Sequence, residues 1–223
     1  MYDRAVVAAR SSPERFLQLR VARVALAAAA EFGFALGGGH ALRLHGLVRR
    51  PTAGVHLATD RESAVRPAVA GVRAALAAEG LAAAPPDEEL FEGSGDAYAE
   101  LTVRDARDAA RLSLARLPRQ HAAVPLSVGP VLHPDDLFAA KVVALATRSE
   151  IRDYLDVGAA LAAGYDRGRL LTLARLHDPG LTDDELAAAL RRLDALPDTP
   201  FLRYGVRSPD VGELRRRLSD WPR

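Results

Sequence analysis

The stretch FALGGGHALRLHGLVRRPTAGVHLATD, residues 34–60, decides how this chain is expected to fold. An apolar run ends in Gly37, Gly38 and Gly39, a helical spacing of apolar residues follows, and a strand-like run covers residues 55–58. This pattern predicts a strand, a tight glycine turn, a helix and a second strand. Glycine lets a backbone approach a ligand closely, and the amides at a helix N-terminus favour anions. The turn therefore indicates a phosphate-bearing ligand, with a plain turn as the alternative, because it is neither G-x-G-x-x-G nor a P-loop.

The composition is that of an ordinary globular protein with a sizeable core. Of the 223 residues, 49% are hydrophobic, and the net charge of +1 gives no global field of the kind that nucleic-acid-binding proteins carry. The absence of cysteine excludes disulfides and thiolate metal ligands. The first residues lack a signal-peptide pattern, and the run VALAAAA is too short to cross a bilayer. We expect a cytoplasmic protein with no membrane partner.

Local signals also predict the remaining elements. Helical spacing predicts a helix over residues 13–31 with Ser12 as its N-cap, and further helices over 39–48 and 61–79. Alternation and short apolar runs predict strands over 34–36, 55–58, 81–84, 98–104 and 111–115, with a loop over 85–96. The last two strands are expected to form a hairpin.

The second half of the chain carries helix start signals. His133 and Pro134 open one helix, Thr182 and Glu185 form a capping box that opens another, and residues 170–176 and 211–218 are also expected to be helical. The predicted fold is α/β (α+β), with a mixed sheet core flanked by helices over residues 1–125. A helical C-terminal region over residues 126–223 is expected to pack on this core as one compact unit.

The opening stretch resembles the AbiEii/AbiGii toxin family of nucleotidyltransferases, a branch of the polymerase-β-like nucleotidyltransferase superfamily. In that family a Gly-Gly turn and a helix precede Arg-x-Ser/Thr-x-Asp-x-Asp, whose two aspartates hold magnesium. Here Arg50 and Thr52 keep the frame, but Gly54 and His56 stand in place of the two aspartates. The family's third metal-binding aspartate lies before a Leu-Ala pair in the second hairpin strand, where this chain has Ser113.

A second region of resemblance covers residues 125–161. The family has a helix with an inward lysine there, then an arginine and Arg-Asp-x-x-Asp; this chain keeps Lys141, Arg148, Arg152, Asp153 and Asp156. The resemblance implies that the lysine contacts phosphate and that the aspartate after the arginine positions or deprotonates the attacking group. Read singly, the lysine could be a solvated charge, and the Arg-Asp-x-x-Asp residues could pair on the helix surface.

Together these matches imply a set of site residues. The candidate catalytic residues are His56, Lys141 and Asp153, and the candidate ligand-binding residues are Gly38, Gly39, His40, His45, Arg50, Thr52, Ser113, Arg148, Arg152 and Asp156. Magnesium requires hard oxygen ligands, so we expect neither magnesium nor another cofactor. Two ways of binding a metal ion stay open. Carboxylates of Asp60, Glu62 or Glu100 could replace the missing aspartates, which would need a register change. Alternatively, His40, His45 and His56 could bind a transition metal. A histidine acting without metal as acid, base or donor is preferred.

These residues and motifs are compatible with three functions. The first is a nucleotidyltransferase-fold protein that has lost magnesium-dependent transfer and uses its pocket for a small-molecule or nucleotide-like ligand or for metal-free chemistry. The second is an active toxin that transfers a nucleotide from an NTP, with magnesium, to an RNA or protein acceptor. The third is a partner-binding subunit without a small-molecule ligand.

Overall fold

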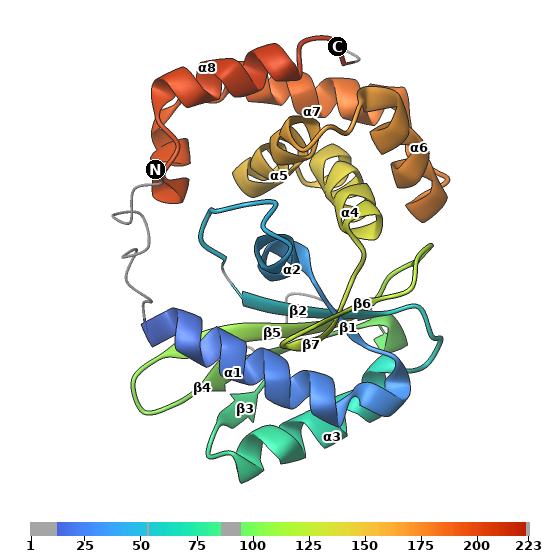
Figure 1. Cartoon of the computed structure of the whole chain (residues 1–223), viewed down its shortest axis with the longest axis vertical. Coiled ribbons are helices and arrows are strands. Elements are labelled where there is room, and N and C mark those ends of the chain that lie inside the picture. The colour runs from blue at the N-terminus through green and yellow to red at the C-terminus, as the bar shows by residue number, and fades with distance from the viewer. Residues whose placement is uncertain (1–12, 53, 86–94, 222–223) are drawn as a thin grey trace, which may run out of the picture. The chain divides into compact units, whose positions relative to one another are not determined.

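A computed structural model describes residues 13–52, 54–85 and 95–221 (Figure 1). The predicted cap Ser12 and most of the predicted loop 85–96 lie outside these residues. The strands are β1 (Ala35–Gly37), β2 (Gly54–Thr59), β3 (Ala82–Ala84), β4 (Tyr98–Arg104), β5 (Ala109–Arg116), β6 (Val124–Leu126) and β7 (Gly129–Val131). They form a seven-stranded sheet in the order β3-β4-β5-β2-β1-β7-β6. Since β2 runs parallel to β5 while β4 is antiparallel to both of its neighbours, the sheet is mixed. The predicted mixed sheet flanked by helices is confirmed.

By internal contacts the chain divides into two compact units that are not sequential. The first unit comprises Met1–Leu36, Ala53–Arg116 and Ser127–Gly129; the second comprises Gly37–Thr52, Leu117–Leu126 and Pro130–Arg223. The glycine turn and the helix after it therefore belong with the C-terminal helices.

The first unit packs two helices on the sheet. Helices α1 (Pro13–Ala28) and α3 (Val65–Ala78) contact each other, and both contact the sheet strands (Figure 1). Their inward residues recur at helical spacing and are fully buried, as Val21, Ala25 and Val72 illustrate. The 3-10 helices η2 (Ala30–Phe32) and η3 (Gly95–Ala97) complete the unit. Strand β5 alternates less than expected because Leu112, Ser113 and Leu114 are all buried.

The second unit is organised around α4 (Pro134–Thr147). This helix contacts α2 (Gly38–Leu44), α5 (Ile151–Ala162), α6 (Arg167–His177) and α7 (Asp183–Ala195), while α5 also contacts η4 (Thr199–Tyr204) and α8 (Ser208–Arg217). Figure 1 shows α4 among α5, α6 and α7. Phe138, Val142 and Leu145 are fully buried, as are Leu186 and Leu190 of α7. The predicted C-terminal helices are present, with small shifts in their ends.

Three predictions about elements need correction. The helix predicted over 39–48 ends at Leu44, because the chain turns at Gly46 with φ +74°. The helix predicted over 61–79 begins only at Val65, so Pro67 falls in its first turn, where a missing N–H breaks no helical hydrogen bond. Strands β6 and β7 were not predicted; each has three residues, and each contains a proline.

Candidate functional site

The glycine turn in the second unit has a specific steric role. Gly38 has φ +65°, a left-handed conformation that favours glycine. A Cβ on Gly39 would lie 2.7 Å from Nη2 of Arg50. Gly39 therefore makes room for a buried guanidinium. The position of Arg50 is therefore enough to explain Gly39, and no bound ligand is needed to explain it. The sequence pattern alone could not distinguish this packing role from a close approach to a phosphate.

The Arg50 guanidinium belongs to a buried charge network. It donates two hydrogen bonds to Asp156, from Nε to Oδ1 at 2.7 Å and from Nη2 to Oδ2 at 2.5 Å. Lys141 Nζ lies 2.8 Å from Asp156 Oδ2 and 3.1 Å from Asp153 Oδ1. Arg148 donates to both oxygens of Asp153 at 2.8 and 2.9 Å. Residues from the segment after α2, from α4 and from α5 are thus joined by ion pairs.

Burial shows that these charges are not solvated surface groups. Asp153 and Asp156 are 0% exposed and Lys141 is 7% exposed, which corrects the surface interpretations of these residues. Since Asp153 and Asp156 are three residues apart on α5, they face the same side and meet the lysine of α4 together. Arg148, at the C-cap of α4, keeps 45% of its side chain exposed. Arg152 pairs with Glu150 at 2.8 Å, and Glu150 lies 3.8 Å from Arg148 Nε, so Arg152 joins the network at its edge through Glu150.

The network keeps Asp153 ionised. Burial, the largest influence, disfavours its charged form, but the hydrogen bonds from Arg148 and the charge of Lys141 outweigh it, so the pKa of Asp153 is lowered from 3.8. Arg50, Lys141, Arg148 and Arg152 supply four positive charges, against the three carboxylates of Glu150, Asp153 and Asp156. The network therefore has one surplus positive charge, and its most exposed cation is Arg148.

The two histidines of the α2 region have different surroundings. His45 lies at the C-cap of the helix, and its Nε2 is hydrogen-bonded to the backbone oxygen of Leu132 at 2.9 Å. His40 follows Gly39, and its buried Nδ1 has no hydrogen-bond partner among the described residues. Burial, followed by the charge of Arg43, lowers the pKa of His40 below 6.5, so it is neutral at physiological pH. Thr52 is half-buried before β2.

The first unit holds the positions where the resemblance places the metal ligands. In the parallel pairing of β2 with β5, His56 is opposite Ser113, and Gly54 is opposite Arg111. His56 Nδ1 and Ser113 Oγ are hydrogen-bonded at 2.6 Å. The strand frame thus brings positions 54, 56 and 113 together without a carboxylate at any of them.

Gly54 is closed to a side chain by its neighbour strand. A Cβ built on it would lie 2.7 Å from the backbone oxygen of Arg111 and 3.2 Å from the Arg111 Cβ. A backbone atom of a central strand cannot move aside as a flexible side-chain end can. A side chain at position 54 would therefore require the pairing of β2 with β5 to shift.

One carboxylate does lie in line with this row. Glu100 of β4 is opposite Ser113 of β5, so both side chains are on one face of the sheet and no register change is needed, contrary to the expectation from sequence. Its Oε2 accepts from the Tyr98 hydroxyl at 2.6 Å, and its Oε1 is 3.7 Å from Arg111. Burial and then the hydrogen bond to Glu100 raise the pKa of Tyr98 to about 12, so Tyr98 stays a proton donor.

The two other carboxylates considered are engaged or exposed. Glu62 pairs with Arg116 at 2.9 Å and has 83% of its side chain exposed, and Asp60, just after β2, is exposed. Sequence reasoning missed Tyr98, whose only signal was its position two residues before Glu100 on a predicted strand. It also assigned no role to His121, His133 and Asp135 as a group, although they lie close together at the start of α4.

Known proteins share this fold. The family described as nucleotidyl transferase AbiEii toxin, type IV toxin–antitoxin system, matches residues 22–200. The chain belongs to this family. No curated protein matches the chain. Among the described residues, no helix is long and apolar enough to cross a membrane.

Solved structures support the AbiEii fold assignment. A crystal structure of a candidate nucleotidyltransferase from Helicobacter pylori is similar with a TM-score of 0.58 at 16% identity, covering 93% of this chain and 94% of that one. MenT4, a nucleotidyltransferase toxin of Mycobacterium tuberculosis H37Rv, is similar with a TM-score of 0.53 at 17% identity, covering 91% and 89%. At these identities the likeness establishes the nucleotidyltransferase fold alone.

Proposed function

We propose that this AbiEii-family protein has lost magnesium-dependent nucleotidyl transfer and uses its remaining site for a phosphate-bearing, nucleotide-like ligand or for metal-free chemistry. The observation that carries the proposal is the closed space at Gly54, where the Arg111 backbone oxygen would meet any Cβ at 2.7 Å. The residues present do not fit a two-magnesium centre, because glycine, histidine and serine occupy the three carboxylate positions.

The energetic consequence of losing the metals is large. In nucleotidyl and phosphoryl transfer, magnesium neutralises phosphate oxygens and clamps the attacking and leaving groups. Its loss is expected to reduce the rate by about 10³-fold or more. At two of the positions that hold metal-binding aspartates in the family, this chain instead has His56 and Ser113, which form a hydrogen bond of 2.6 Å.

The surviving charges support an anionic ligand. Lys141 and Arg50 are held in place by Asp153 and Asp156, and Arg148 faces solvent with 45% of its side chain. Because the network carries more positive than negative charge, an incoming phosphate would find net attraction rather than repulsion. We therefore assign Arg148 the leading role in anion contact. Asp153 holds the Arg148 guanidinium in place, and Lys141 in turn holds Asp153.

A second candidate function rests on Glu100. Its alignment with Ser113 offers one carboxylate in the expected row, and magnesium can be held by one or two carboxylates plus phosphates and water. An active toxin would transfer a nucleotide from an NTP to an RNA or protein acceptor through this glutamate. The ion pair with Arg111 and the hydrogen bond from Tyr98 would have to yield to the metal.

The family description also supports a partner protein. Members are described as toxins of type IV toxin–antitoxin systems. A partner protein, the antitoxin, is therefore expected. A subunit that serves only this partner would show no affinity for nucleotides. It would instead form a stable complex in a pull-down.

Calorimetry with the four NTPs, with and without magnesium, tests the proposal. We expect binding that is indifferent to magnesium and weakened about tenfold by Arg148→Ala, as expected for a lost charge-assisted contact. Transfer of label from α-labelled NTPs to tRNA is measured in parallel. Magnesium-strengthened binding together with transfer would overturn the proposal.

Glu100→Gln separates the two candidates. If the protein is an active transferase that recruits Glu100, this variant should lose magnesium-dependent transfer. Glu62→Gln is the matched control, because Glu62 is an exposed carboxylate of the same unit that pairs with Arg116. Binding of no nucleotide under any condition would favour the partner-only function.

A further inference from the structure

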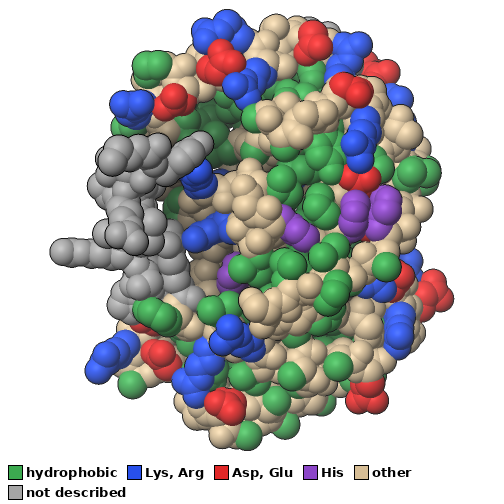
Figure 2. All heavy atoms as spheres, in the orientation of Figure 1, with side chains coloured by type: hydrophobic (Ala, Val, Ile, Leu, Met, Phe, Trp, Pro, Cys, Tyr) green, Lys and Arg blue, Asp and Glu red, His purple; other side chains and the backbone are tan. Residues whose placement is uncertain are grey.

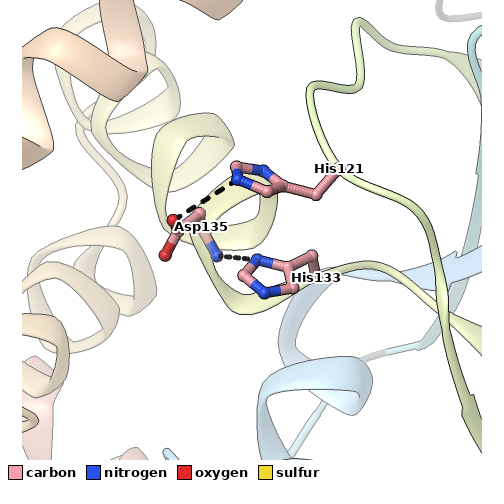
Figure 3. Close-up of side chains that lie close together, drawn as sticks. All are labelled: His121, His133 and Asp135. Atoms are coloured by element: carbon pink, nitrogen blue, oxygen red, sulfur yellow. Dashed lines mark hydrogen bonds and ion pairs between the residues drawn. The ribbon is translucent and has the colours of Figure 1, made fainter.

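Two histidines and an aspartate converge at the start of α4, in the second unit (Figure 3). Ligand-type atoms of His121, His133 and Asp135 all lie within 4.8 Å of one another. His121 Nε2 is 3.7 Å from Asp135 Oδ2, and the two imidazole rings stack with centroids 4.4 Å apart. Within residues 13–52, 54–85 and 95–221, these three side chains form the one group of at least three potential metal ligands that lie close enough to share an ion.

We propose that His121, His133 and Asp135 bind a divalent transition-metal ion of the zinc class. Two imidazoles and one carboxylate are a frequent zinc donor set, and imidazole nitrogen selects zinc, copper or nickel over magnesium. With metal bonds of about 2.0–2.2 Å, the donor atoms of a tetrahedral site lie about 3.3 Å apart. The donors therefore need to close by only about 1.5 Å from their present separation.

A buried aspartate positions the segment that carries His121. Asp136 is 1% exposed and accepts hydrogen bonds from the backbone N–H groups of Gln120 at 2.9 Å and His121 at 3.1 Å. His177 Nε2 lies 3.0 Å from the same carboxylate. In metal sites generally, residues that hydrogen-bond to the ligands fix the ligands' orientation and strongly affect the affinity for the metal. The site is thus supported by α4 and α6 rather than by a free loop.

Metal binding requires three contacts to be exchanged. His133 Nδ1 accepts from the Asp135 backbone N–H at 3.2 Å as the helix N-cap, and the Asp135 carboxylate is held by Arg169 at 3.0 Å and by the Tyr165 hydroxyl at 2.5 Å. The stacked rings have planes only 18° apart, so His121 must turn its edge toward the ion. This rotation moves His121 Nδ1 away from Asp136 Oδ1, which lies 3.6 Å from it, and the 38% of the side chain that is exposed leaves room for the movement.

Arg169 gives the proposal a distinctive signature. Its guanidinium competes with any cation for Asp135, and 51% of its side chain is exposed, so it can leave toward solvent. Figure 2 shows histidine side chains reaching the surface beside acidic and basic ones. Removing Arg169 should therefore strengthen metal binding, which an unspecific surface histidine would not predict.

The test is a titration of the full chain, without a polyhistidine tag, with Zn²⁺ and separately with Mg²⁺. Zinc affinity is measured by competition with a chromophoric chelator, and Co²⁺ serves as an absorbing substitute. We expect one Zn²⁺ per chain, a melting temperature that rises with Zn²⁺ but not with Mg²⁺, and a loss of about 10- to 100-fold in zinc affinity in His121→Ala.

Three further variants decide the outcome. Arg169→Ala should bind zinc about tenfold more tightly, because it removes a positive charge that repels the ion and competes for Asp135, while His45→Gln and His56→Gln, outside the cluster, should bind as the unchanged chain does. Circular dichroism checks that each variant is folded. Unchanged zinc affinity in both His121→Ala and Arg169→Ala, binding that depends on His56, or no zinc binding at all would overturn the proposal.

Discussion

At the residue scale, Gly39 tests whether the glycine turn exists to accommodate Arg50. Gly39→Ala should push the Arg50 guanidinium away from Asp156, because the added methyl would lie 2.7 Å from Nη2. We expect the free energy of unfolding to fall by about 1–3 kcal/mol, measured by urea denaturation. Gly71→Ala is the matched control: its Cβ would meet only the Ala28 oxygen, at 3.8 Å, so the helix α3 should gain stability. Equal effects of the two substitutions would contradict the role assigned to Gly39.

The buried network predicts a strong effect of Asp156. Asp156→Ala would leave Arg50 and Lys141 without this counter-charge in a buried site. Removing one partner of such a network typically destabilises by about 3–5 kcal/mol. Chemical denaturation measures this loss, and Asp183→Ala provides the comparison, since its pair with Arg175 is exposed on both sides. That exposed pair should contribute less than about 1 kcal/mol.

Sequence reasoning finds most members of this network but not its connections. Lys141 stands out because it is the only lysine in the chain, and Asp153 and Asp156 because of their spacing. The same spacing suggests a local pair with Arg152. The actual partner of Asp156 is Arg50, 106 residues earlier. No local pattern encodes a contact of that kind, and the steric closure of Gly54 by β5 escapes sequence for the same reason.

At the element scale, the capping box of α7 makes a direct prediction. Thr182 Oγ1 accepts from the Glu185 N–H, and the Glu185 carboxylate accepts from the Thr182 N–H at 2.9 Å. Thr182→Ala should therefore lower the free energy of unfolding by about 0.5–2 kcal/mol. Thr172→Ala in α6 is the control, because its hydroxyl bonds a helix carbonyl that is already used within the helix. A larger loss in the control than in Thr182→Ala would speak against the cap.

Elements with strong local signals were predicted best. The cap at His133, the capping box at Thr182 and the hairpin of β4 with β5 follow from residues that are neighbours in sequence, and the structure confirms them. The short strands β6 and β7 have no such signal, because three residues cannot display a period. Their pairing is decided by the sheet rather than by their own composition.

At the scale of the whole molecule, buried aspartates predict the response to acid. The pKa values of Asp135, Asp136 and Asp153 are lowered from 3.8, because hydrogen bonds and nearby cations outweigh burial, the largest opposing influence. A lowered folded pKa contributes stability above the unfolded pKa, and this contribution is lost as the pH falls through the folded value. Stability should therefore decline below about pH 4. Urea midpoints at pH 7, 5, 4 and 3 check this, and a midpoint that rises on acidification would refute it.

The two compact units of the molecule do not follow sequence order. Composition and periodicity favoured a core over residues 1–125 and a helical region after it. By internal contacts, however, Gly37–Thr52 groups with the C-terminal helices, because α2 packs on α4 and Arg50 reaches Asp156. The family membership and the mixed sheet were accessible from the glycine stretch and the alternating strands. The chemistry that remains at the site depends on side chains that only the folded chain brings together.

The burial of Lys141 has a practical consequence for acylation. Lys141 carries the only side-chain amine in the chain. This amine is held between the carboxylates of Asp153 and Asp156, and 9% of the side chain is exposed. Reagents that acylate amines, and enzymes that acetylate lysine, therefore find no accessible lysine on the folded second unit. Modification of Lys141 should occur only when α4 and α5 separate, so the rate at which acyl groups accumulate there, read by mass spectrometry, would report the opening of this helical pair.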